Sequence, residues 1–133
     1  MSGPFSSWPT FDQDEINAVS EVLNTGNVNY WTGSQCKYFE KEFAELHACK
    51  YAIAVANGTL ALELAMIALG IGPGDEVIVT SRTFLASVSS IVLSGAIPIF
   101  ADVDISSQNI TPQTISEKIT SKTKAIVCVH IAG

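Results

Sequence analysis

Residues 1–50 carry their apolar positions at the spacing of an α-helix. In "DQDEINAVSEVLN", residues 12–24, apolar side chains recur every three or four positions and acidic residues occupy the first turn, where the helix dipole favours them. Gly26 is a typical residue to end such a helix. After the turn-rich "TGNVNYWTGS", a second amphipathic stretch aligns Tyr38, Phe39, Phe43 and Leu46 along one side. The pattern predicts an N-terminal helical segment over residues 1–50.

From Tyr51 onward, short apolar runs alternate with longer helical stretches. The strand-like runs lie near residues 52–56, 76–80, 97–101 and 125–130, and the helical stretches at 59–69, 84–94 and 112–119. Such alternation is typical of a parallel sheet built from right-handed βαβ units with helices on both faces. We therefore expect residues 51–133 to form part of an α/β domain.

The composition of the chain argues against several kinds of binding partner. The chain is 47% hydrophobic and 15% charged with a formal net charge of −6, which argues against an electrostatic grip on nucleic acid or anionic lipid. The longest apolar stretch contains Glu63 and is too short to span a bilayer, and the N-terminus lacks the pattern of a signal peptide. We expect a cytoplasmic protein that does not contact membranes. Cys36, Cys49 and Cys128 form no C-x-x-C pair, so neither a disulfide framework nor a metal site is indicated.

The alternation breaks at Asn57-Gly58-Thr59, between a predicted strand and a predicted helix. At the carboxyl end of a parallel strand, such a turn points free backbone N–H groups and a helix dipole outward, which suits an anion. Gly58 lets the backbone approach closely, and Thr59 can cap the helix or donate a hydroxyl to a phosphate oxygen. The tripeptide fits a phosphate site and equally an ordinary helix cap. The chain has neither a P-loop nor a G-x-G-x-x-G motif.

The next predicted strand ends in "VIVTSRTFLAS", which brings Ser81, Arg82, Thr83 and Phe84 to the neighbouring loop. Phe84 is either a platform for an aromatic cofactor ring or a core residue at a helix start. Further along, Asp102 and Asp104 in "FADVD" have no partner histidine, so we interpret them as capping or solvated carboxylates.

These residues resemble a known family. The stretch "ANGTLALELAMIALGIGPGDEVIVTSRTFLASVSSIVLSGAIPIFADVD", together with the upstream "FEKEFAELHACKYAIAVANGT", is similar to the DegT/DnrJ/EryC1/StrS sugar aminotransferases. Those are pyridoxal-phosphate (PLP) enzymes of aminotransferase fold type I. The resemblance implies that Asn57, Gly58 and Thr59 form the cofactor-phosphate site, and that Phe84 stands where an aromatic residue stacks on the pyridine ring. Asn57 stands where many relatives have a serine.

The resemblance implies an architecture and an activity. The chain would be the N-terminal part of the large PLP-binding domain, truncated before the Schiff-base lysine and the acid that pairs with the pyridine nitrogen. None of its lysines stands where the family places the catalytic one, so we assign no catalytic residue and expect this chain alone to be inactive. The implied reaction of the full-length family transfers an amino group from a donor such as glutamate to a keto-sugar nucleotide. It belongs to amino-sugar synthesis for cell-surface polysaccharide or a glycosylated metabolite, and the enzymes are typically homo-oligomers.

Two other readings stay open. The chain can be a noncatalytic fragment that acts only through protein association, since an uncovered sheet edge favours association. It can also be a Rossmann-like nucleotide-binding module, which needs only a strand, a turn and a helix but normally carries the missing glycine motif.

Overall fold

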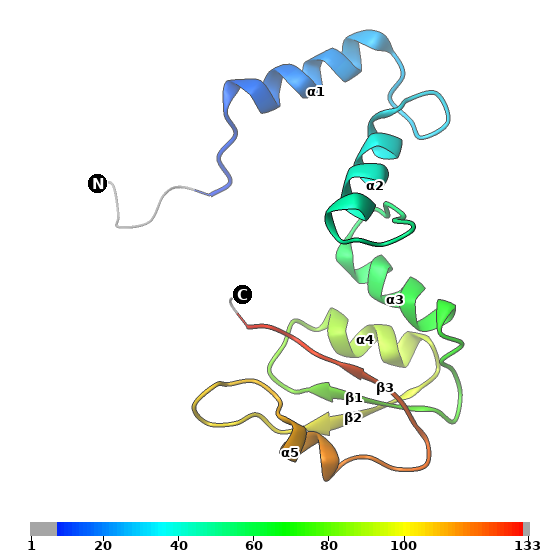
Figure 1. Ribbon diagram of the computed structural model, residues 1–133, viewed down its shortest axis with the longest axis vertical. Coiled ribbons are helices and arrows are strands. Elements are labelled where there is room, and N and C mark those ends of the chain that lie inside the picture. The colour runs from blue at the N-terminus through cyan, green and yellow to red at the C-terminus, as the bar shows by residue number, and fades with distance from the viewer. Residues whose placement is uncertain (1–7, 132–133) are drawn as a thin grey trace. The chain divides into compact units, whose positions relative to one another are not determined.

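The computed structural model describes residues 8–131, and its chain divides into two units at Ala54 and Val55. Figure 1 labels the helices and strands along the chain.

The first unit begins with helix α1, Gln13–Thr25, as the apolar spacing predicts. Asp12 caps the helix: its side chain accepts hydrogen bonds from the backbone N–H groups of Asp14 and Glu15, and the Glu15 side chain accepts one from the Asp12 N–H. This capping box satisfies donors that the first turn leaves free. Gly26 ends the helix in the left-handed conformation, at φ 71°.

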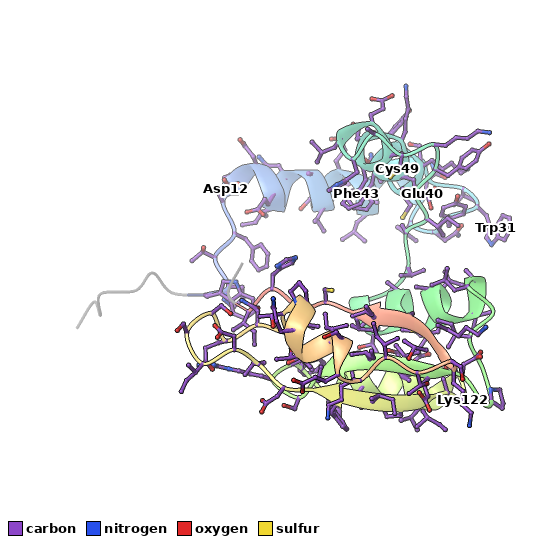
Figure 2. The ribbon with its side chains drawn as sticks, turned by 60° about the horizontal axis from the view of Figure 1, so that its bottom comes forward. Asp12, Trp31, Glu40, Phe43, Cys49 and Lys122 are labelled. Carbon is purple, nitrogen blue, oxygen red and sulfur yellow. The ribbon has the colours of Figure 1, made fainter. Side chains whose placement is uncertain are left out.

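Helix α2, Gln35–Leu46, follows a tightly turned loop and confirms the second amphipathic stretch. Asn29 Oδ1 accepts from the N–H groups of Trp31 and Thr32, which holds the loop. A Cβ atom at Gly33 would lie 2.6 Å from the Asn27 carbonyl oxygen, so only glycine fits there. On α2, Glu40 and Phe43 are labelled in Figure 2.

The predicted strand at residues 52–56 is wrong for the described chain, because this segment forms no strand and belongs to no sheet. A strand needs a hydrogen-bonded neighbour, and the described strands pair only with one another. The Ala54 N–H instead donates to Glu40 Oε1 at 2.8 Å. A side chain of α2 therefore takes the hydrogen bond that a neighbouring strand would otherwise accept.

The second unit contains a parallel sheet, as predicted. Strands β1 (Glu76–Thr80), β2 (Ile97–Ala101) and β3 (Thr123–Val127) form a three-stranded sheet in the order β2-β1-β3. Residue Ile78 at the centre pairs with Ile99 on one side and Ile126 on the other. The last strand begins and ends earlier than the predicted 125–130, since Thr123 already lies in the ladder and the chain leaves it after Val127.

The second unit also contains helices α3 (Gly58–Ala68), α4 (Ala86–Leu93) and α5 (Pro112–Ser116), of which α4 packs on β1 and β2 and α3 packs on α4. From β1 the chain crosses to β2 through α4, and from β2 it returns past β1 to β3 through α5. Right-handed crossovers in opposite directions place their helices on opposite faces, and α4 and α5 indeed lie above and below the strands in Figure 1. Helices α4 and α5 are shorter than the predicted 84–94 and 112–119, because turns flank them at Phe84 and Lys118.

Central strand β1 is covered on both faces. Val77, Ile78 and Val79 are fully buried, as is Ile91 of α4. One face packs in a cluster with α3 and α4, whose members are Met66, Ile71, Val77, Val79, Ile91 and Ala96. An apolar run buried on both sides is typical of a strand in a parallel sheet.

Candidate cofactor site

The carboxyl ends of the parallel strands meet at one edge of the sheet in the second unit. Strand β1 leads there into residues 81–85, and β2 into residues 102–111. Helix α3 runs back toward the amino end of β1, so its first turn faces this carboxyl edge; α3 and α4 also pack against each other. In Figure 1 both helices begin on the side of the strand arrowheads. The two turns that the sequence singles out therefore lie at the same end of the unit.

The first of these turns opens α3. Asn57 is the N-cap residue in an extended conformation, and its Oδ1 accepts from the Leu60 N–H at 3.0 Å. Asn57, not Thr59, thus caps the helix. Helix geometry leaves the N–H groups of Gly58 and Thr59 without intrahelical acceptors. These amides and the positive end of the helix dipole form a surface suited to an anion.

Open space lies in front of Gly58. A Cβ atom built there would meet no atom within 4 Å, and the backbone φ is not in the left-handed region. The fold itself therefore does not require glycine at this position. The missing side chain leaves the Gly58 and Thr59 amides open to close approach by a group from outside the chain.

The second turn follows β1 and is held by its hydroxyl groups. Thr80, nearly fully buried, accepts from the Arg82 N–H at 3.1 Å through Oγ1, and the Thr83 and Ser87 hydroxyls lie 2.7 Å apart. Phe84 is 78% exposed, so its ring lies outside the described core. An exposed aromatic ring and a free helix N-terminus suit the two ends of a phosphorylated aromatic cofactor.

The carboxylates of Asp102 and Asp104, beside this edge, accept hydrogen bonds from backbone N–H groups close by in the sequence. Asp104 Oδ1 accepts from the N–H groups of Ser106 and Ser107, and the Ser107 backbone bond is the first cause of a lowered Asp104 pKa. Asp102 Oδ1 accepts from the Val103 N–H at 2.8 Å. Asp104 thus caps the turn that follows it, whereas Asp102 is an exposed carboxylate that bonds only to the next residue.

No lysine of the described second unit lies at the carboxyl edge. Lys122 precedes β3 and Lys124 lies within its first residues, at the opposite end of the strand, while Lys118 follows α5. Figure 2 shows Lys122 in the connection that enters β3. Within residues 8–131 there is also no group of three side chains suited to a metal ion, and no helix long and apolar enough to cross a membrane.

A parallel α/β unit with a helix N-terminus at its carboxyl edge is the arrangement of a broad class of phosphate-binding proteins. The particular family follows from comparison: the chain belongs to the DegT/DnrJ/EryC1/StrS aminotransferase family, whose sequence model matches residues 9–133. The resemblance stated from the sequence motifs is confirmed.

Solved structures agree with this assignment. The chain is 62% identical to an aminotransferase from Psychrobacter cryohalolentis, with a TM-score of 0.94 over 98% of this chain and 33% of that one. It is 40% identical to 3-amino-5-hydroxybenzoic acid synthase, with a TM-score of 0.89 over 97% and 34%. NtdA from Bacillus subtilis, solved with bound PMP, is 36% identical, with a TM-score of 0.82 over 90% and 28%. The chain thus spans about a third of the length of these relatives.

Sequence reasoning missed one residue at this edge. The side chain of Gln108, in the loop after β2, accepts a hydrogen bond from Arg82 Nη1. The two residues are 26 positions apart, so only the parallel pairing of β1 and β2 brings their loops together. The available signal was the turn-forming "DISSQN" at a strand end.

Proposed function

We propose that this chain is the N-terminal part of a PLP-dependent aminotransferase of the nucleotide-sugar type. The full protein would pass an amino group from an amino-acid donor to a keto-sugar nucleotide, in amino-sugar synthesis for cell-surface polysaccharide. Family membership and the aminotransferase relatives support the lineage. The observation that carries the role of this chain is the pair of free amides at Gly58 and Thr59, at the edge that also exposes Phe84.

Each residue of the proposed site has a separate task. The N–H groups of Gly58 and Thr59 hold the cofactor phosphate, and the Thr59 hydroxyl adds a donor. Asn57 keeps those amides in position by capping the next one at Leu60. Phe84 packs against the ring and restricts its orientation. When bound, PLP supplies an electron sink for the amino-group transfer.

The proposal separates binding from turnover. A catalytic lysine must reach the cofactor ring, and the lysines of the described second unit lie away from the carboxyl edge. We therefore propose that the 133-residue chain binds PLP weakly and does not transaminate. Residues 51–133 would supply the first part of the PLP-binding domain, preceded by the helical segment 1–50. We place the full enzyme in the cytoplasm as a homo-oligomer.

The test is a titration of the chain with PLP, followed by the ³¹P resonance of the cofactor. The parent chain should shift and broaden this resonance, and pyridoxal, which lacks the phosphate, should bind more weakly. Gly58→Val should weaken PLP binding about tenfold or more, because a hydrogen bond to a charged group contributes about 1.5–3 kcal/mol. The valine side chain enters open space, so thermal stability should change little.

The matched control is Gln13→Val, which places the same side chain at the first position of α1. It should leave PLP binding unchanged, because Asp14 and Glu15 already make that helix terminus acidic. If Gly58→Val binds PLP as tightly as the parent chain, the turn is only a helix cap and the proposed phosphate site is wrong.

A second candidate function rests on exposed apolar side chains. Phe84, Leu85 and Leu93 near α4, and Phe100 and Ile126 on the outer strands, are all exposed within the second unit. Such a surface favours association with another protein chain. This noncatalytic alternative predicts binding of a protein partner without any binding of PLP.

A further inference from the structure

Arg82 is an isolated cation at the carboxyl edge. It is the chain's only arginine, because the seven basic residues include Lys37, Lys41, Lys50, Lys118, Lys122 and Lys124. In the described second unit the lysines lie in or before β3 or after α5, whereas Arg82 follows the last residue of β1 by two positions. Any anion that approaches this edge therefore meets one guanidinium group in a chain of net charge −6.

The backbone of Arg82 is fixed although the side chain is exposed. Its N–H donates to the buried Thr80 side chain at 3.1 Å, and the Thr83 hydroxyl is paired with that of Ser87 in α4. The turn is therefore anchored on both sides, to β1 and to α4. Anchoring of this kind lowers the entropy lost when a side chain binds a ligand.

The side chain of Arg82 is also held. Nη1 donates to Gln108 Oε1, and Gln108 has a left-handed backbone, at φ 59°, that residues other than glycine rarely adopt. The Gln108 N–H donates to the Asp104 carbonyl at 2.8 Å, and Nε2 donates to the Ile105 carbonyl at 2.6 Å. Bonds within the loop after β2 thus fix the backbone of Gln108 and its side-chain amide, which accepts the hydrogen bond from the Arg82 guanidinium.

Gln108 positions the guanidinium without neutralising it. The amide is uncharged, and no ion pair involves Arg82 in the described part of the chain. Asp104, in the same loop, is engaged by the amides of Ser106 and Ser107. A guanidinium carries five N–H donors, so several remain available for a planar anion.

We propose that Arg82, oriented by Gln108, binds an anionic group of the substrate, either a phosphate or a carboxylate, and so contributes to substrate choice. The inference rests on the proposed function, which supplies two sources of such a group: the diphosphate of a nucleotide sugar and the carboxylate of the amino donor. The cofactor phosphate has its own site at Gly58 and Thr59. Because the proposed function gives the cofactor phosphate to those amides, we assign Arg82 to a second anion.

The sole arginine permits a direct test, because the ¹⁵N-labelled chain should give one Nε–Hε resonance. UDP and L-glutamate are titrated separately, with uridine and sodium chloride of equal ionic strength as controls. A saturable shift with UDP but not uridine assigns a phosphate, and one with glutamate beyond that of salt assigns a carboxylate. If neither anion shifts the resonance more than salt does, Arg82 only ties two loops together and the proposal is wrong.

Variants of Arg82 and Gln108 separate the effect of the guanidinium charge from the effect of its orientation. Arg82→Met should weaken binding of the identified anion about tenfold or more, Arg82→Lys less, and Gln108→Ala severalfold although the arginine remains. Anion binding is then followed through backbone amide shifts, whose dispersion also reports folding. Unchanged affinity in Arg82→Met overturns the proposal. If that variant does not fold, the Nε–Hε titration of the parent chain decides the question.

The test is separate from that of the proposed function. Gly58→Val should lose PLP binding and keep the Arg82 response to its anion. A parent chain that fails to bind PLP but shows the Arg82 shift would refute the cofactor site alone. One that binds PLP without any Arg82 shift would refute only the assignment of Arg82.

Discussion

Asn57 caps one backbone amide in the first turn of α3 and leaves two others free to bind an anion. Its side chain satisfies the Leu60 N–H, while the earlier amides of Gly58 and Thr59 stay free. A residue at this position therefore affects both helix stability and anion binding, although it need not touch the anion. Any side chain with an acceptor oxygen at this position can cap the helix. The charge of that side chain determines how well an anion binds at the neighbouring amides.

Asn57→Asp should separate these effects. The aspartate keeps an acceptor for Leu60 and interacts favourably with the helix dipole, so stability should hold or rise by about 0.3–1 kcal/mol. PLP affinity should fall about tenfold, since two negative charges near the surface repel by about 1–4 kcal/mol at 4 Å. Thermal unfolding and the ³¹P titration measure the two quantities. Tighter PLP binding in this variant would contradict a phosphate at this turn.

At the scale of the elements, Glu40 of α2 links two separate segments of the first unit. One carboxylate oxygen accepts from the Ala54 N–H at 2.8 Å and the other from the Tyr30 hydroxyl at 3.0 Å. Helix α2 thereby holds both the loop that precedes it, through Tyr30, and the segment that follows it, through Ala54. The Glu40 carboxylate thus accepts one backbone hydrogen bond of a segment that has no neighbouring strand.

This link predicts a titration. The hydrogen bond to Glu40, and then its charge, raise the pKa of Tyr30 above the ordinary tyrosine value. A raised pKa means that the stabilisation is present below the ordinary value and is lost as pH rises through the higher one. Glu40→Gln should lower the pKa of Tyr30, measured by absorbance of the ionised phenol. Tyr30→Phe identifies the phase, and an unchanged titration in Glu40→Gln would show that the bond does not persist in solution.

Elements with a local cause could be predicted from the sequence. Strands 76–80 and 97–101 have the predicted bounds, because each is a short apolar run between turn-forming residues. Segment 52–56 has the same apolar pattern but no neighbour in the described sheet, and pairing is not a local property. The candidate site divides likewise: the turn at Gly58 follows from a local helix start and the one at Phe84 from a strand-to-helix transition, whereas the contact of Arg82 with Gln108 depends on sheet order.

At the scale of the whole molecule, the second unit leaves apolar surface on its outer strands. Strands β2 and β3 are the edges of the described sheet, and each exposes backbone groups that another strand can pair with. Phe100 on β2 is 49% exposed, and Ile97 and Ile126 are also exposed. An apolar edge of this kind favours contact with further protein surface.

We therefore expect the chain to self-associate as its concentration rises, and Phe100→Lys should reduce this association. The lysine removes an exposed apolar ring from β2 and adds a charge, which opposes edge-to-edge contact. Ile105→Lys is the control: Ile105 is 87% exposed but lies in a loop outside the sheet, so its effect should be small. Sedimentation velocity over a range of concentrations measures the outcome. A clean monomer at high concentration, or equal loss of association in both variants, would show that the β2 edge is not the contact surface.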